Sequence, residues 1–333
     1  MIEYRYIQKA TDLPPGWDVI ADNYFQQRSF LSHTERYNPC HQRYYQCIED
    51  GKLVSAAIVY SLRIDFLTFI HIKSPVRMHI VGIPCSVSGQ GIFGDRQAVA
   101  KLKDYIYETE KGFVLVLNLK EKSSAGKYAF GKTLPTIILT NTYTSWTDYE
   151  ISLRSDYRRR LKHISQSNED LSFEKKSCND FTLGMYGQYI EVYKRSSGKL
   201  EKLSFDFFKN LPPEFILTTC SKNNEVIGWN IALFNEKVYY FFMGGVDYVF
   251  NKACNTYLRL LSVIINDGIE KQAAFIELGQ TAETPKMRLG GIPTPLYLEA
   301  HHSNGVLNFL VRLFSPMLEY RRKLEDAHPL KEI

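Results

Sequence analysis

The densest positive charge in the chain lies between residues 154 and 162. On a helix, Arg154 and Arg158 would be one turn apart, and Arg159 and Lys162 would form an adjacent stripe. Cations this close repel one another unless an anion or carboxylates neutralise them, and planar guanidinium groups match phosphate geometry. The segment is therefore a candidate for binding a phosphate-bearing donor. The competing interpretation is a solvated basic face that is balanced by the acidic residues at 148, 150 and 156.

Glu277 lies within an apolar run, residues 274–278, that is typical of a strand. Side chains alternate along a strand, so Glu277 and Gly279 share one face. A carboxylate at the end of a strand can take the proton of an attacking amine when burial raises its pKa. Gln280 and Tyr297 follow as candidates to orient the substrate, and we place Tyr297 with Glu277 in the catalytic set. The alternatives are a structural glutamate and a proton transfer assisted by the substrate.

Two glycine-containing patterns are weaker indicators of a binding site than the residues above. Residues 89–94 read G-x-G-x-x-G, which is the nominal dinucleotide fingerprint. Hairpin strands precede them, however, and the next strand ends in Asn118-Leu119-Lys120, which offers no acidic residue to a ribose. A Rossmann site is therefore not predicted. Asp247 follows two glycines after a strand, where it can either bind the acceptor amine or shape a turn.

The elements that would position these residues occur in the same order in both halves of the chain. Each half contains two hairpin strands, a third strand, a helix and a final apolar strand, and these are expected at 43–48, 53–60, 78–83, 95–110 and 113–119, and again at 215–220, 226–234, 238–243, 251–267 and 274–278. Gly268 would end the second of these helices. The order predicts a duplicated α/β unit with mixed sheets.

Helix signals also flank the second half. The sequence Ser145-Trp146-Thr147-Asp148 resembles a capping box that opens a helix running through Leu161. An amphipathic helix is expected at 306–318. We therefore place the domains at 1–144 and 145–333, the second with a basic entry helix and a C-terminal amphipathic helix.

Composition and charge exclude several classes of protein. The 333 residues carry a net charge of only +5, which is too small an excess to argue for a nucleic-acid partner by itself. No apolar run approaches the ~20 residues that span a bilayer, and no signal peptide is evident at Met1. The six cysteines form no Cys-x-x-Cys pair, and Cys40-His41 with Cys47 lacks a second pair of ligands, so we expect a reduced cytoplasmic protein without a metal site.

The stretch FIELGQTAETPKMRLGG, residues 275–291, resembles the end of the second GNAT-like domain in Fem-type acyltransferases of peptidoglycan biosynthesis. Glu277 and Gly279 match the strand end of that pattern, and Lys286, Leu289 and Gly290 match its Lys-x-x-Leu-Gly turn. Residues 244–247 and 255–258 and the basic helix at 157–162 resemble the same group. The coiled-coil arm that some members carry is missing from this chain.

The resemblance implies two tandem GNAT-like folds and a catalytic role for Lys286, whose cation would face donor phosphates or the developing oxyanion. A surface lysine in a loop is the alternative. In a GNAT domain the loop at 86–91 would be the pyrophosphate turn, with Ser86 in place of the usual Arg or Gln. Beside the catalytic residues Lys286, Glu277 and Tyr297, we assign donor or substrate binding to Arg158, Arg159, Asp247, Asn255, Gln280 and Arg288.

The predicted function is an N-acyltransferase that moves an acyl or aminoacyl group to an amine on a cell-wall, polysaccharide or small-metabolite precursor. The co-substrate would be an acyl-CoA or an aminoacyl-transfer RNA, with no tightly bound cofactor. The alternative is a catalytically silent protein of the same fold that binds a phosphorylated or nucleotide ligand, or RNA.

Overall fold

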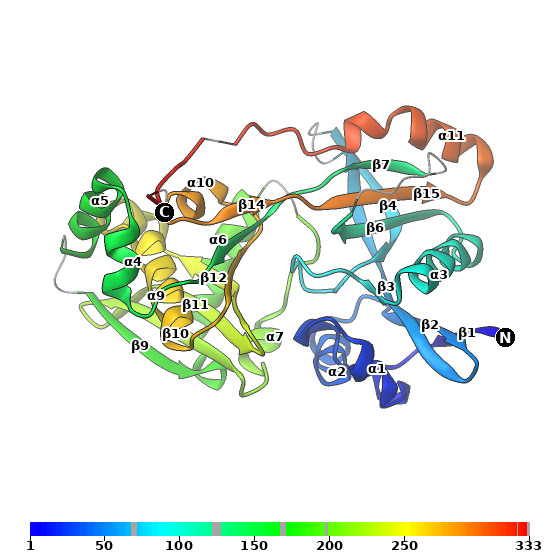
Figure 1. Ribbon diagram of the computed structural model, residues 1–333, viewed down its shortest axis with the longest axis horizontal. Helices are drawn as coiled ribbons and strands as arrows, with labels where there is room; N and C mark the ends of the chain where they lie inside the picture. Colours follow the sequence, from blue (N-terminus) through cyan, green and yellow to red (C-terminus); the bar gives the residue numbers. More distant parts are fainter. Residues whose placement is uncertain (68–71, 122–127, 167–170, 197–198, 325, 332–333) are drawn as a thin grey trace. The chain divides into compact units, whose positions relative to one another are not determined.

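The computed structural model describes residues 1–67, 72–121, 128–166, 171–196, 199–324 and 326–331, which form two compact units (Figure 1). The first unit contains residues 1–134, 197–207 and 295–321, and the second contains residues 135–196, 208–294 and 322–333. The sequence led us to a single boundary between 144 and 145. The chain instead passes from one unit to the other at 134/135, 196/197, 207/208, 294/295 and 321/322.

The described part of the first unit is built on a sheet in the order β1-β2-β3-β4-β6-β15-β7, with β5 paired to β3. These strands are β1 (Ile2–Ile7), β2 (Arg43–Glu49), β3 (Lys52–Leu67), β4 (Ile72–Val81), β5 (Ile92–Gly94), β6 (Phe113–Leu119), β7 (Ala129–Lys132) and β15 (Tyr297–His302). The helices are α1 (Gly16–Ile20), α2 (Arg28–Tyr37), α3 (Arg96–Thr109) and α11 (Gly305–Leu313). The apolar side of α3 packs through Leu102 and Ile106 against Val59, Val114 and Val116 of the sheet.

The sheet of the second unit has the order β14-β8-β13-β12-β11-β10-β9. Its strands are β8 (Thr136–Thr140), β9 (Leu171–Ser177), β10 (Phe215–Lys222), β11 (Glu225–Asn235), β12 (Val238–Val246), β13 (Phe275–Gly279) and β14 (Ile292–Thr294). The helices are α4 (Trp146–Ser152), α5 (Ser155–Gln166), α6 (Leu183–Arg195), α8 (Tyr248–Cys254), α9 (Thr256–Glu270) and α10 (Glu283–Met287), while α7 (Phe205–Lys209) contains the crossing at 207/208. Leu261, Ile264 and Ile265 of α9 form the core with Ile276 and Leu278 of β13.

The predicted duplication is confirmed in the pairing of the strands. In both units an antiparallel hairpin is closed by two residues with positive φ, Asp50-Gly51 and Asn223-Asn224. In both units the third strand then pairs in parallel with the strand that follows the helix, as β4 with β6 and β12 with β13. The described residues therefore contain two copies of one mixed α/β unit.

The two halves of the sequence exchange strands. β8 comes from the first half, yet it pairs with β13 and β14 of the second unit. β15 comes from the second half, and it lies between β6 and β7 of the first unit. Each sheet is therefore completed by a strand from the other half of the chain.

Several expected helices differ from the prediction. The helix expected at 251–267 is divided into α8 and α9 by Asn255, which has a φ of 52°, and the helix expected at 306–318 ends at Leu313, before a 3-10 turn at Ser315–Leu318. The helix expected from Trp146 through Leu161 is broken into α4 and α5, because Leu153 forms a β-bridge with Leu330 and the N–H of Arg154 donates to the carbonyl of Pro329 at 2.8 Å. Gly268 does not end α9, which continues to Glu270. A Cβ at position 268 would lie 2.6 Å from Ile276, so this glycine permits close packing of α9 on β13.

Candidate functional site

The parallel strands β12 and β13 separate in the middle of the second unit. Their pairing runs from Val238 and Phe275 to Tyr240 and Glu277 and then stops, although β12 continues to Val246 and β13 to Gly279. A register shift in the β11–β12 pairing leaves Phe242 as an extra residue, and such a bulge bends the strand that carries it. Ends of parallel strands that part in this way are a common place for a ligand in α/β sheets.

Lys286 reaches the place where these strands separate. Its side chain is 2% exposed, and its Nζ donates to the carbonyl oxygens of Gly279 at 3.2 Å and Gln280 at 2.6 Å. The same nitrogen lies 5.7 Å from the centre of the Phe241 ring, which belongs to the first residue of β12 beyond the paired stretch. The ammonium group therefore contacts both strands at their point of divergence.

Burial lowers the pKa of Lys286 to about 7, and the nearby carboxylates of Glu283 and Glu277 only partly oppose that shift. A lysine with this pKa exchanges its proton readily near neutral pH, which a surface lysine does not. Its two hydrogen bonds to carbonyl groups use two of the three donors of an ammonium group. The third N–H makes no hydrogen bond to the described residues. The alternative of a surface lysine is therefore wrong.

The turn that returns Lys286 to the end of β13 has an uncommon backbone. Thr281 and Ala282 both have positive φ, 58° and 46°. For a β-branched residue such as Thr281 this conformation is costly, and such residues concentrate at functional sites. The turn aims Lys286 at the carbonyl groups of Gly279 and Gln280.

Glu277 lies on β13 beside this cluster. It is partly buried, and the hydroxyl of Thr136 in β8 donates to its Oε1 at 3.3 Å. Its negative charge raises the pKa of Lys286, which places the two predicted residues within electrostatic reach of each other. Gln280 also belongs to the cluster, but through its backbone carbonyl rather than the side chain that we had assigned to the substrate.

Glu283 is a member of the site that the sequence did not reveal. It is 2% exposed, lies one helical turn before Lys286 on α10, and accepts a hydrogen bond from Arg322 Nη1 at 3.3 Å. Its only signal in the sequence is a carboxylate at the start of a short helix, where surface residues are equally common. The carboxylate helps to hold a positive charge on Lys286.

The remaining candidates of the second unit lie in other surroundings. Arg159 is exposed and paired with Asp156, and Arg158 donates to the carbonyl of Ile151 at 3.4 Å. Asp247 caps α8 by accepting from the N–H groups of residues 249 and 250, so it shapes a turn. Asn255 has a φ of 52° and joins α8 to α9, and Arg288 follows the last residue of α10. Their roles in binding stay predictions.

Tyr297 belongs to the first unit, whereas Lys286 and Glu277 belong to the second. It lies on β15 in the sheet of the first unit, where its ring stacks on Phe130 with 5.2 Å between ring centres. Because the chain crosses between the units at 294/295, the short spacing from Lys286 to Tyr297 in sequence does not imply membership in one cluster.

In the first unit, other protein groups fill the space around the glycine loop at 86–91 and cap the start of α3. A Cβ on Gly91 would lie 2.1 Å from the backbone nitrogen of Gly82, and Asn118 donates to the carbonyls of Val87 and Gly89. The carboxylate of Asp95 accepts from two N–H groups at the start of α3, which are the groups that would otherwise bind a phosphate. Close packing thus accounts for these glycines. In the second unit the side chain of Asn255 makes no capping hydrogen bond at the start of α9, and Asn251 accepts from the N–H of Tyr257 there at 2.8 Å.

The cap formed by Asp95 leads to a prediction about stability. Removing it in Asp95→Ala should lower the free energy of unfolding by about 1 kcal/mol, since two N–H groups lose their acceptor. Urea denaturation followed by circular dichroism measures the change. Asp95→Ser is the matched control, because serine also caps helices and should stay within a few tenths of a kcal/mol of the wild type. Equal stability of the alanine and serine variants would show that the cap contributes nothing.

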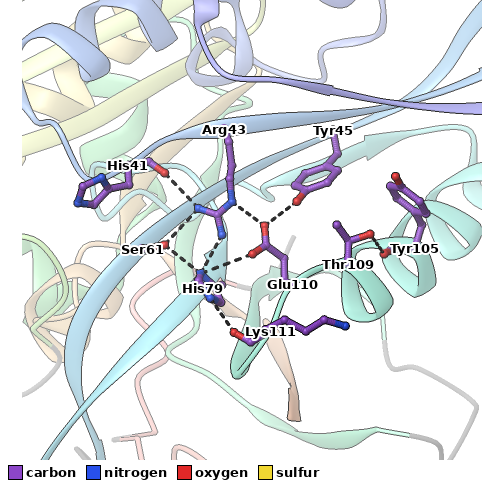
Figure 2. Close-up of polar contacts among 9 residues, drawn as sticks. All are labelled: His41, Arg43, Tyr45, Ser61, His79, Tyr105, Thr109, Glu110 and Lys111. Carbon is purple, nitrogen blue, oxygen red and sulfur yellow. Dashed lines mark hydrogen bonds and ion pairs between the residues drawn. The ribbon is translucent and has the colours of Figure 1, made fainter. Parts of the chain in front are cut away.

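A second polar cluster lies in the first unit (Figure 2). Arg43 Nε donates to Glu110 at 2.5 Å, the hydroxyl of Tyr45 donates to the same oxygen at 2.6 Å, and Arg43 also contacts Ser61 and His79. Although burial acts to raise it, hydrogen bonds from Arg43 and Tyr45 lower the pKa of Glu110 below its usual value.

The arrangement around His79 differs from a catalytic triad. Ser61 and Glu110 both face its Nδ1, at 2.9 and 3.7 Å, while its Nε2 lies 3.0 Å from the carbonyl of Lys111 (Figure 2). A relay needs the hydroxyl and the carboxylate on opposite nitrogens. Burial also lowers the pKa of His79, and its Nδ1 faces the hydroxyl of Ser61 and the guanidinium group of Arg43.

Within the described ranges, His, Cys, Asp and Glu side chains form no group of three or more that could hold a metal ion. No helix in that part of the chain has the length and apolar character needed to cross a membrane. All six cysteines are buried and free.

Neither a protein-family model nor a curated protein matches the sequence. Solved structures match nearly the whole chain. FemX has a TM-score of 0.58 at 10% identity, covering 93% of this chain and 100% of FemX. A tandem GNAT protein from the clavulanic acid biosynthesis pathway has a TM-score of 0.55 at 10% identity, covering 91% and 99% of the two chains. L-PGS from Bacillus licheniformis has a TM-score of 0.54 at 11% identity, covering 95% and 98%.

Identities this low concern the fold and not the chemistry of the site. The alignments extend over both units, so the likeness includes the tandem arrangement. The chain therefore has two GNAT-like folds in tandem and shares the architecture of FemX, as the resemblance of residues 275–291 led us to expect.

Proposed function

We propose that the chain is an N-acyltransferase that uses the second unit to move an acyl or aminoacyl group from an activated donor to an amine. The observation that carries this proposal is the buried ammonium group of Lys286 at the point where β12 and β13 separate. In an acyl transfer, negative charge develops on the carbonyl oxygen of the donor, and a fixed buried donor at that oxygen lowers the barrier. The remaining N–H of Lys286 suits one such oxygen better than a phosphate with several.

The reaction that fits this site forms one bond and breaks one. The nitrogen of the acceptor amine attacks the carbonyl carbon, and the C–N bond replaces the bond from carbon to the sulfur of a thioester or the oxygen of an ester. The attacking nitrogen loses one proton, for which Glu277 is the predicted acceptor, and the leaving group takes up a proton as it departs. Thr136, by donating to Glu277, fixes the direction of that carboxylate.

Acyl-CoA and aminoacyl-transfer RNA are both retained as donors. The tandem GNAT protein from the clavulanic acid biosynthesis pathway is described as a structure without acetyl-CoA, which names a thioester of coenzyme A as the relevant ligand of that protein, and L-PGS and FemX share the same fold. We propose an amine on a cell-wall, polysaccharide or small-metabolite precursor as the acceptor. Arg158 and Arg159 on α5 supply the charge that an RNA donor would need beyond the site itself.

Product formation is the test of this function. The full-length chain is incubated with a set of acyl-CoA thioesters or with charged transfer RNA, together with a mixture of amines, and the products are identified by mass spectrometry. A new amide that requires one donor class is expected. With charged transfer RNA as donor, Arg158→Gln with Arg159→Gln should raise KM at least tenfold and reduce its salt dependence, because each phosphate contact releases counterions. With acyl-CoA, the same variant should keep its KM.

Binding of a donor without any amide product would contradict the proposal. That outcome would favour the silent alternative, a protein that keeps the tandem fold and binds a phosphorylated or nucleotide ligand, or RNA.

A further inference from the structure

The helix α11 turns its apolar side chains towards solvent. Val306, Phe309 and Leu313 are 71%, 63% and 59% exposed. Together with Leu310 they occupy positions i, i+3, i+4 and i+7, which form one stripe on a helix. Leu307 and Phe314 widen this stripe, and each is also more than a third exposed.

The side of α11 that faces its own unit is narrow. Asn308 accepts a hydrogen bond from the backbone N–H of His302 on β15 at 3.0 Å, and Val311 packs against Ala129 and Ala300. In a helix on the surface of a globular protein the apolar stripe normally faces the core. Most apolar side chains of α11 instead face away from the first unit, which leaves the stripe available to a partner.

The stripe is larger than the scattered apolar residues of an ordinary protein surface. Its six side chains, exposed by between 39% and 71%, offer on the order of several hundred Å² of apolar surface. A continuous apolar patch of this size marks a binding surface, and on a short helix it suits insertion into the boundary between lipid headgroups and acyl chains.

Charge around the helix is complementary to anionic lipid. The segment from Ser303 to Leu318 contains no acidic residue, and Arg312 is exposed on α11. Arg321 follows with a side chain that is 66% exposed, and its nearest carboxylate, Glu319, is 3.9 Å away. On the strand that supports the helix, the carboxylate of Glu299 is fully buried and bound to Lys103, so it does not repel an anionic surface.

We propose that α11 is a membrane-docking helix that inserts Val306, Phe309 and Leu313 into the surface of a bilayer containing anionic phospholipid. Its nine residues span about 14 Å, so it lies along the surface and does not cross the bilayer. Arg312 and Arg321 supply positive charge for the phosphate groups of the lipid. This inference rests on the first unit and does not depend on the proposed acyl transfer.

Vesicle co-sedimentation of the full-length chain tests the proposal. Vesicles of phosphatidylcholine are compared with vesicles of equimolar phosphatidylcholine and phosphatidylglycerol. The wild type should bind the anionic vesicles at least tenfold more strongly, and the triple variant Val306→Ser, Phe309→Ser, Leu313→Ser should lose at least tenfold of that binding. Because these side chains are exposed, circular dichroism should report an unchanged fold.

The matched control removes three other exposed apolar side chains, in Val19→Ser, Leu183→Ser and Val249→Ser, which are 84%, 72% and 80% exposed. This variant should bind like the wild type. In Phe309→Trp, addition of anionic vesicles should shift tryptophan emission to shorter wavelength, which supports insertion at this residue even if the triple variant does not fold.

Three results would overturn the proposal: no binding of the wild type to anionic vesicles, equal binding of the triple variant and the wild type, or a wild-type dimer in analytical ultracentrifugation that the triple variant abolishes. The last result would assign the stripe to a second copy of the chain.

Discussion

Lys286→Met should lower kcat for acyl transfer by about a hundredfold to a thousandfold and, at neutral pH, raise the free energy of unfolding. The loss of rate is that expected when one donor to a developing oxyanion is removed. The gain in stability follows from burial, which lowers the pKa of Lys286 from 10.5 to about 7 in the folded state. At about 1.4 kcal/mol per pKa unit, keeping this lysine charged costs the folded protein up to about 5 kcal/mol.

The net gain will be smaller than that limit. Methionine leaves the carbonyls of Gly279 and Gln280 without the Nζ donor, at a cost of about 1–3 kcal/mol. We therefore expect Lys286→Met to be more stable by roughly 2 kcal/mol at pH 7. A residue kept at the expense of stability is typical of a functional site.

The pH dependence of the free energy of unfolding shows whether the lowered pKa of Lys286 causes the gain in stability. Above pH 10.5 the lysine is neutral in both the folded and the unfolded chain, so it carries no penalty for charge. As the pH falls from about 10.5 towards about 7 the unfolded chain takes up the proton first, and the penalty grows until it is constant below about 7. The advantage of Lys286→Met in urea denaturation should therefore shrink as the pH rises above 7.

Lys271→Met is the matched control, because Lys271 is exposed just beyond the end of α9. It should change neither kcat nor the dependence of stability on pH. A Lys286→Met variant with the kcat of the wild type would remove Lys286 from the mechanism. An advantage in stability that stays constant from pH 7 to 10.5 would disprove the depressed pKa.

Glu201→Gln should remove a loss of stability that the wild type undergoes between acid and neutral pH. Glu201 is 6% exposed on the segment 197–207, which belongs to the first unit, and neither of its carboxylate oxygens has a partner in hydrogen-bonding geometry. Burial raises its pKa from 4.5 to about 7, and the backbone of Glu201 itself and nearby Ser86 oppose the shift only in part. Its neighbours include the buried thiols of Cys40 and Cys85.

A raised carboxyl pKa makes ionisation unfavourable in the folded state. Below about pH 4.5 the group is protonated in both states and there is no penalty. Between about 4.5 and 7 the unfolded chain loses its proton first, so the stability of the wild type falls by about 3 kcal/mol and is then constant above about pH 7. Glutamine has no proton to lose, so Glu201→Gln should lack this fall.

Urea denaturation from pH 4.5 to 8 measures the difference, which should be small at the acid end and about 2–3 kcal/mol in favour of Glu201→Gln at pH 8. Glu214→Gln, at an exposed position, is the control and should follow the wild type. A wild-type profile parallel to that of Glu201→Gln would show that Glu201 ionises normally.

Local patterns in the sequence predicted the repeated elements well. The strand expected at 113–119 has those bounds in the structure, and the helix expected at 95–110 is α3. Alternating burial and turn residues act within a few residues of one another, so they can be recognised in sequence. The sheet to which β8 and β15 belong could not be predicted in this way. By its local pattern either strand could pair with either sheet, and the packing of the whole unit decides between them.

The candidate site was predicted in part. The motif at 286–290 identified Lys286, and the apolar strand before it identified Glu277, but their surroundings depend on contacts distant in sequence. Phe241 and Arg322 approach the site from elements far along the chain, and no local pattern marks Glu283 as buried. Charge density likewise indicated Arg158 and Arg159 without showing that Arg159 pairs with Asp156 on the surface.

The exchange of β8 and β15 also bears on how such a chain can evolve or be divided. A gene divided between codons 144 and 145 would encode two fragments. The first would contain β8, which belongs to the sheet of the second unit, and the second would contain β15, which lies between β6 and β7 in the sheet of the first unit. Neither product would be a self-sufficient module, although each holds a full copy of the repeated motif. The two units must therefore be kept in one chain. Substitutions in β8 and β15 are constrained by the packing of the sheet that each strand completes.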